Sequence, residues 1–386
     1  MNNKQNPSST LASLDRPIKA TADDAVLAKL ATTQAGYYKD PFLENFARRS
    51  TGGISSGGPT AMPGERRVIQ PIIKRGTHAR VCVMDRALSA FCKANTDGSQ
   101  IVVLGAGKDT SYFRLCNGNI AGLEDNVECQ KKKIRWYEVD HFSVIHEKAA
   151  MIRQSQQLSY FCPNLKETRH GYETTASDHS SIHDLSSSFH LVNHDLRDSP
   201  NLLLGKLSLD PSLPTLFLTE CVFMYMPNEA SQLLLQALSS CVEHVYMACY
   251  EPILGDRNAR DPFGQMMEQN LIKAGVASPG SCLLKTRTLL EQLHKLTNSG
   301  FARAVGCDMW SAYETILTVE QRKTANQSEF LDEYEEWILI MQHYCFVVAT
   351  SDPTSPFAAV QNVNDKASKP SLVGFVSNKC NELNKP

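Results

Sequence analysis

Residues 100–115 constrain the fold of this chain more than any other stretch. They include four consecutive apolar residues at 101–104, three of which are β-branched. Such a run is typical of a strand that is buried on both faces of a parallel sheet. Gly105 and Gly107 follow directly, and a helix opens behind them. Because glycine has no Cβ and tolerates a positive φ, this unit predicts a site where a nucleotide-like ligand passes close to the backbone.

The residues after the turn argue against a dinucleotide as that ligand. Thr110 stands where a dinucleotide-binding turn has its third glycine, and Asp109 places a carboxylate beside the turn. This carboxylate would repel a diphosphate, whereas it suits a cationic or zwitterionic nucleoside. A lone Gly-x-Gly also occurs simply because strand-to-helix turns are tight, so other residues have to identify the ligand.

Composition limits the class of protein. The chain has 386 residues and a net charge of −2, so it can bury a sizeable core but has no basic field for nucleic acid. Its twelve cysteines lack C-x-x-C pairs and metal-ligand spacing, which predicts reduced core residues and no metal site. Because neither a secretory signal nor a membrane span of about 18 apolar residues is present, we expect a soluble cytoplasmic or nucleocytoplasmic protein without membrane contacts. We also expect it to be a monomer.

The pattern along the chain predicts one folded domain at residues 21–351 between disordered, polar tails at 1–20 and 352–386. Its N-terminal part, 21–99, is predicted to be helical apart from a flexible glycine- and serine-rich loop at 50–64. The core, 100–351, alternates short apolar runs with helices, which is typical of a doubly wound, Rossmann-like α/β sheet with lid insertions. A polar stretch at 116–133 reads as an insertion, and two late strands are expected to pair antiparallel at one edge.

Acidic residues end three of the predicted strands, at Asp140, Asp195 and Glu220. In an open α/β sheet the ligand lies beyond the carboxyl ends of the strands, so these side chains are expected to meet. Any one of them alone is more often a helix cap or a solvated loop residue. Together they suit a single ligand: Asp140 accepts from two ribose hydroxyls, Asp195 accepts from an adenine amine, and Glu220 holds an ammonium group.

Three further residues complete this predicted site. Leu196 is expected to lie against the adenine ring, next to Asp195 in the sequence. Arg80 and Lys29 can bind a carboxylate, unless they are only exposed charges on helices. A ligand that carries adenine, ribose, an ammonium group and a carboxylate is S-adenosylmethionine, which we therefore predict as the cofactor.

Several motifs resemble one known family. They include Gly-Tyr-Tyr-Lys-Asp-Pro-Phe at 36–42, Arg-Gly-Thr-His-Ala-Arg-Val at 75–81, Gly-Ala-Gly-Lys-Asp-Thr at 105–110, Glu-Cys-Val at 220–222, Phe-Gly-Gln-Met-Met at 263–267 and His-Tyr-Cys at 343–345. In this order they are similar to the leucine carboxyl methyltransferases, which methylate the C-terminal leucine of the protein phosphatase 2A catalytic subunit. The resemblance runs from about residue 25 to 350.

The resemblance implies a class I S-adenosylmethionine-dependent methyltransferase fold, an N-terminal helical extension and an inserted lid. It implies methyl esterification of the phosphatase C-terminal leucine carboxylate, which regulates holoenzyme assembly, with the phosphatase tail as the partner. The matching cofactor-binding positions are Lys29, Arg80, Gly105, Asp140, Asp195, Leu196 and Glu220. The chain departs from the family at 50–64, at 116–133 and at 257–262, where Arg257 and Arg260 are alternatives for one family arginine.

The reaction would need no general base, because a C-terminal carboxyl group has a pKa near 3.5 and is ionised at neutral pH. Tyr225, Tyr250 and Arg257 are our candidates for holding this carboxylate, although a tyrosine in an apolar run is more often a core residue. Two other functions stay open: a nucleoside-binding regulatory protein without turnover, and a methyltransferase that acts on a small carboxylic acid.

Overall fold

The computed structural model describes residues 7–47, 68–123, 134–174, 188–257, 260–355 and 375–377, without the side chains of 7–20 and 375–377. The predicted flexible loop at 50–64 and most of the insertion at 116–133 lie outside these residues. Within them, no helix is both long and apolar enough to span a bilayer.

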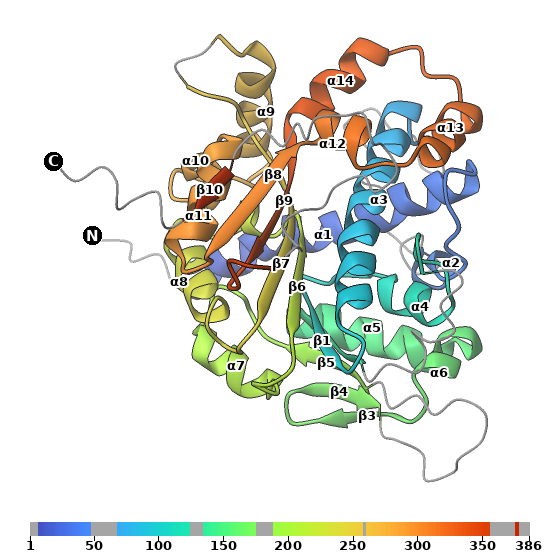
Figure 1. Cartoon of the computed structure of the whole chain (residues 1–386), viewed down its shortest axis with the longest axis vertical. Coiled ribbons are helices and arrows are strands. Elements are labelled where there is room, and N and C mark those ends of the chain that lie inside the picture. Colours follow the sequence, from blue (N-terminus) through green and yellow to red (C-terminus); the bar gives the residue numbers. More distant parts are fainter. Residues whose placement is uncertain are drawn as a thin grey trace, which may run out of the picture.

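The described strands form one mixed sheet in the order β10-β8-β9-β7-β6-β1-β2-β5-β4-β3 (Figure 1). Its five central strands run parallel: β7 (Val245–Pro252), β6 (Thr215–Glu220), β1 (Ser99–Leu104), β2 (Ile134–Asp140) and β5 (Ser188–Asn193). Helices cover both sides of the sheet. This arrangement confirms the predicted α/β class.

Both faces of the central strand are buried, as its uninterrupted apolar run predicts. Ile101 and Val103 belong to one apolar core, and Val102 and Leu104 belong to the core on the opposite face. Successive side chains of a strand point to opposite faces, so each core receives every second residue. All six residues of β1 are buried.

The antiparallel strands lie at the two edges. β9 (Tyr344–Thr350) runs antiparallel to both β7 and β8 (Arg303–Asp308), which confirms the predicted late pair. Outside β8 lies β10 (Phe375–Ser377), so the prediction of disorder throughout 352–386 is wrong at this strand. At the other edge β3 (Leu165–Thr168) and β4 (Gly171–Thr174) form a hairpin that extends the sheet beyond β5.

Three N-terminal helices precede the sheet: α1 (Pro7–Gln34), α2 (Leu43–Ala47) and α3 (Pro71–Ala94). Because α1 begins at Pro7, the predicted disorder of residues 1–20 is wrong from that residue onward. Pro71 starts α3, where the missing backbone N–H has no helical partner to lose. α1 packs on α3, and this pair stands beside the carboxyl ends of the central strands.

The other helices connect the strands and cover the sheet. They are α4 (Ser111–Cys116), α5 (Phe142–Gln154), α6 (Gln156–Phe161), α7 (Pro200–Leu207), α8 (Asn228–Leu238), α9 (Pro262–Lys273), α10 (Cys282–Lys285), α11 (Leu289–Asn298), α12 (Met309–Thr315), α13 (Val319–Ser328) and α14 (Tyr334–Gln342). A 3-10 helix, η2 (Phe223–Tyr225), follows β6. α9 and α10 are inserted between β7 and α11, and they pack on Met224 of η2.

Candidate functional site

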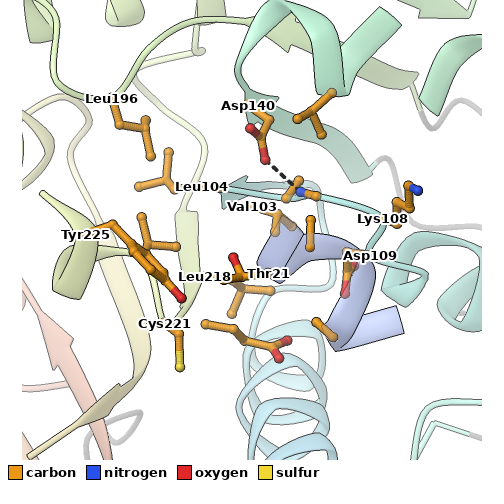
Figure 2. A pocket seen from close by; sticks show the side chains of 18 of the residues that line it. Thr21, Val103, Leu104, Lys108, Asp109, Asp140, Leu196, Leu218, Cys221 and Tyr225 are labelled. Carbon is orange, nitrogen blue, oxygen red and sulfur yellow. Dashed lines mark hydrogen bonds between the residues drawn. The ribbon is translucent and has the colours of Figure 1, made fainter. Parts of the chain in front are cut away.

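A cavity of about 400 Å³ lies at the carboxyl ends of the central strands, between α1, α3 and η2 (Figure 2). Parallel strands place their carboxyl ends along one edge, which brings residues distant in sequence together. All eight residues predicted to bind the cofactor line this cavity: Lys29, Arg80, Gly105, Gly107, Asp140, Asp195, Leu196 and Glu220.

The glycine turn after β1 needs glycine for two separate reasons. Gly105 and Gly107 have φ angles of +63° and +51°, in the left-handed region that residues with a Cβ rarely adopt. A Cβ on Gly105 would also lie 2.7 Å from Cγ2 of Val222, whereas a Cβ on Gly107 would meet Ala22 at an ordinary 3.5 Å. The turn at Gly105 is therefore packed directly against the segment after β6.

Asp140, at the end of β2, holds this turn in place. Its Oδ2 accepts a hydrogen bond from Gly107 N at 2.7 Å (Figure 2). Its Oδ1 accepts one from His141 N at 2.6 Å. Burial raises the pKa of Asp140, while these two amides favour the ionised form. Each carboxylate oxygen can accept a further hydrogen bond, so Asp140 is able to bind two hydroxyl groups of a ligand.

Positive and negative side chains alternate below the glycine turn. Lys29 Nζ lies 3.4 Å from Glu220 Oε2 and 3.5 Å from Asp109 Oδ2, and Arg80 Nε lies 3.2 Å from Glu220 Oε2. Burial alone would raise the pKa of Asp109, but Lys29 and Lys148 hold it below its ordinary value. Two cations and two carboxylates in one wall provide partners for both charges of a zwitterion.

Arg80 rests on an aromatic stack behind the cavity. Its guanidinium lies 5.5 Å from the centre of the Tyr250 ring, which stacks on Tyr344 with centroids 5.2 Å apart. Burial raises the pKa of Tyr250 well above its ordinary value, so this side chain stays neutral. Tyr250 does not line the cavity; it lies against Arg80 and supports that side chain.

Arg257 also lies elsewhere. Its side chain is 62% exposed and stands 3.8 Å from Glu268 on α9, beside a separate polar pocket of about 210 Å³. The alternative residue, Arg260, is exposed and lines neither pocket. The loop after β7 carries both arginines toward α9, a path that could not be read from the sequence. Of the three substrate-carboxylate candidates, only Tyr225 lines the main cavity.

Asp195 and Leu196 form a different part of the wall, after β5. Arg197 binds the Asp195 carboxylate through both oxygens, with Nε at 2.9 Å from Oδ1 and Nη2 at 2.6 Å from Oδ2. Burial would raise the pKa of Asp195, but the hydrogen bonds from Arg197 outweigh it and lower the pKa. Asp195 therefore stays an ionised acceptor, and Arg197 fixes its orientation.

Sequence reasoning overlooked two residues that shape the site. Thr21 of α1 lines the same cavity as Tyr225 (Figure 2). Glu251, at the end of β7, accepts hydrogen bonds from three backbone amides of the segment after β6. Its position at a strand end beside β6 was the available signal, by the same rule that selected Glu220.

The structure offers no alternative centre for metal chemistry in the part of the chain that it describes. No three His, Cys, Asp or Glu side chains among those residues are grouped so that they could hold a metal ion. None of the ten described cysteines forms a disulfide, and seven of them are buried.

Comparison with known proteins identifies the family of this chain. The family model described as leucine carboxyl methyltransferase matches residues 18–239. The chain is 30% identical over 347 residues to the leucine carboxyl methyltransferase 1 homolog of Arabidopsis thaliana, covering 88% of this chain and 91% of that protein. It is 30% identical over 340 residues to leucine carboxyl methyltransferase 1 of Rattus norvegicus, covering 87% and 90%.

Solved structures are more distant. A geranyl diphosphate methyltransferase in complex with GPP and sinefungin matches with a TM-score of 0.42 and 10% identity, over 88% of this chain and 99% of that chain. A likeness of this size carries no argument about the site. The family model and the relatives show the family: the chain belongs to the leucine carboxyl methyltransferase family.

Proposed function

We propose that this protein transfers a methyl group from S-adenosylmethionine to the α-carboxylate of a C-terminal leucine, and that its substrate is the catalytic subunit of protein phosphatase 2A. The observation that carries this proposal is the single cavity in which Asp140, Asp195 and the charged wall around Glu220 meet. Membership of the leucine carboxyl methyltransferase family supports the acceptor group. The resemblance described above supports the choice of phosphatase.

The residues in the cavity suit the cofactor part by part. Asp140 would accept from the ribose hydroxyls, and Asp195 with Leu196 would hold the adenine. Lys29 and Arg80 would bind the carboxylate of the methionine part, and Glu220 would bind its ammonium group. When bound, S-adenosylmethionine supplies an activated methyl group, and the two glycines leave room for it beside the backbone.

The acceptor carboxylate needs orientation more than activation. A C-terminal carboxyl group is ionised at neutral pH, so the protein has to desolvate this anion and hold it in line with the methyl group. Tyr225 can contribute, because burial raises the pKa of its hydroxyl to about 12 and the group stays a neutral hydrogen-bond donor. Its place in the cavity wall, next to Thr21, is consistent with this role.

The test is transfer of label from methyl-labelled S-adenosylmethionine to the purified phosphatase catalytic subunit. We expect incorporated label that mild base removes, as for an ester, and no incorporation into a subunit that lacks its terminal leucine. Labelling of the truncated subunit would contradict the leucine claim. Labelling of a small acid instead would favour the small-molecule alternative, and cofactor binding without any transfer would favour a regulatory protein.

A further inference from the structure

The segment at 220–226, which joins β6 to α8, forms one wall of the cavity. Glu220, Cys221, Val222, Tyr225 and Met226 of this segment all line it. The same segment meets the glycine turn, since Val222 occupies the space where a Cβ on Gly105 would be. The conformation of this segment therefore fixes the position of the Glu220 carboxylate and the width of the cavity beside the glycine turn.

This wall is not held by its local sequence. Cys221 has a φ of +55°, a left-handed conformation that is uncommon for a residue with a Cβ. The 3-10 helix η2 has three residues and no side-chain cap of its own, so its first backbone N–H groups need acceptors from elsewhere. A partner outside the segment has to stabilise this arrangement.

Glu251 is that partner. Its Oε1 accepts hydrogen bonds from Val222 N and Phe223 N, both at 2.9 Å, and its Oε2 accepts one from Met224 N at 3.2 Å. The register of the sheet explains why Glu251 can contact these amides. Glu220 pairs with Tyr250, so the next residue of β7, Glu251, lies beside the segment that follows β6. The carboxylate is only 2% exposed and satisfies three successive amides.

Opposing effects act on the protonation of the Glu251 carboxyl group. Burial raises the pKa of Glu251, while the Lys295 ammonium and the three amides act in the opposite direction. Lys295 is itself buried; its Nζ donates to Gln292 Oε1 at 2.6 Å and lies 4.6 Å from the centre of the Phe223 ring. Lys295 and the three amides therefore give the Glu251 carboxyl group its polar partners inside the protein, on the side of the wall away from the ligand.

We infer that Glu251 is a positioning residue for the methyl donor: its carboxylate holds the three amides and thereby sets Glu220, Val222 and Tyr225 in the cavity. Glu251 does not line the cavity itself and acts only through this wall. The inference rests on the proposed function, because it takes S-adenosylmethionine as the ligand that the wall contacts.

The substitution E251Q tests this role. The glutamine oxygen can still accept from Val222 N and Phe223 N, but its amide NH₂ would then face Met224 N as donor against donor. We expect S-adenosylmethionine to bind about tenfold more weakly by calorimetry, and hydrogen exchange of the Val222, Phe223 and Met224 amides to accelerate. Val245→Ala, at the opposite end of the same strand, is the matched control for general destabilisation.

The expected pattern is a loss of affinity and of local protection in E251Q, and a lower melting temperature with unchanged affinity in V245A. Equal affinity of E251Q and the wild-type protein would overturn the inference alone, and so would an equal loss in both variants. Failure of the wild-type chain to bind S-adenosylmethionine would overturn the proposed function together with the inference. If E251Q does not fold, E251D keeps the charge but shortens the side chain, and the same loss of affinity is expected.

Discussion

The replacement of Gly105 by alanine tests the site at its most constrained point. Alanine would have to adopt a φ of +63°, which costs about 1–2 kcal/mol for a residue with a Cβ. Its Cβ would lie 2.7 Å from Val222 Cγ2 and 3.4 Å from Val222 Cγ1, an overpacking that costs about 1–3 kcal/mol more. We expect Gly105→Ala to lower the free energy of unfolding by about 2–5 kcal/mol.

Substitutions at two other glycines separate the cost of the positive φ from the cost of overpacking. Gly107→Ala requires a similar φ of +51°, but its Cβ would make only an ordinary contact at 3.5 Å, so a loss of about 1–2 kcal/mol is expected. Gly205 lies within α7, and apart from its chain neighbours and the helix's own backbone no atom lies within 4 Å of an added Cβ. Because alanine is the better helix former, Gly205→Ala should stabilise the protein by about 0.5–1 kcal/mol.

Urea unfolding of the three variants measures the free energies, and calorimetry with S-adenosylmethionine measures binding. Gly105→Ala should lose affinity as well as stability, since either the new methyl group or the displaced Val222 narrows the cavity. The pair Gly105→Ala and Val222→Ala should couple favourably in a double-mutant cycle, because removal of the valine methyls relieves the contact. Equal stability of the Gly105 and Gly107 variants, or additive effects in the cycle, would refute this reasoning.

Three further predictions use other parts of the molecule. Asp140→Asn should weaken S-adenosylmethionine binding about tenfold by calorimetry, because one carboxylate acceptor becomes a donor; unchanged affinity would contradict its assignment. Burial raises the pKa of Glu138 to about 7 from 4.5, so the native state keeps a proton that the unfolded state releases, and stability should fall as pH rises through this window. Glu138→Gln should flatten the dependence of stability on pH in this window, measured by urea titrations. An unchanged slope would argue against a raised pKa of Glu138 in the native state. Thr288→Ala removes the capping box of α11 and should cost about 1 kcal/mol in thermal unfolding without a change in cofactor affinity.

The central sheet could be predicted because its signals are local. Buried strands of four to eight apolar residues and the glycine turn identify β1, β2, β5, β6 and β7 without knowledge of their neighbours. The parallel arrangement then places Asp140, Asp195 and Glu220 at one edge as a geometric consequence. The agreement of these strand-end residues with the cavity lining follows from topology and needs no precise side-chain geometry.

The wrong predictions concern segments whose structure depends on distant contacts. The strand β10 lies in a polar C-terminal stretch and gains its partners only from the edge of β8. The polar composition of residues 7–20 suggested disorder, yet they extend α1. Of the candidates for holding the substrate carboxylate, Arg257 lies near Glu268 of α9 and Tyr250 lies beneath Arg80, positions that depend on contacts between distant segments.

The charged wall shows why the residue list could be predicted when the interactions could not. Glu220 is expected from its strand, but its contacts with Lys29 and Arg80 require α1 and α3 to pack beside the same strand end. These contacts determine how a zwitterion can bind: a ligand carboxylate has to share Lys29 and Arg80 with Glu220, while the ligand ammonium gives Glu220 an additional positive partner. Because the zwitterion brings one charge of each sign, the net charge of the wall does not change on binding this part of the ligand. The site must therefore select its ligand by the positions of the charged groups and not by net charge. The glycine turn, Asp140 and the wall held by Glu251 define these positions.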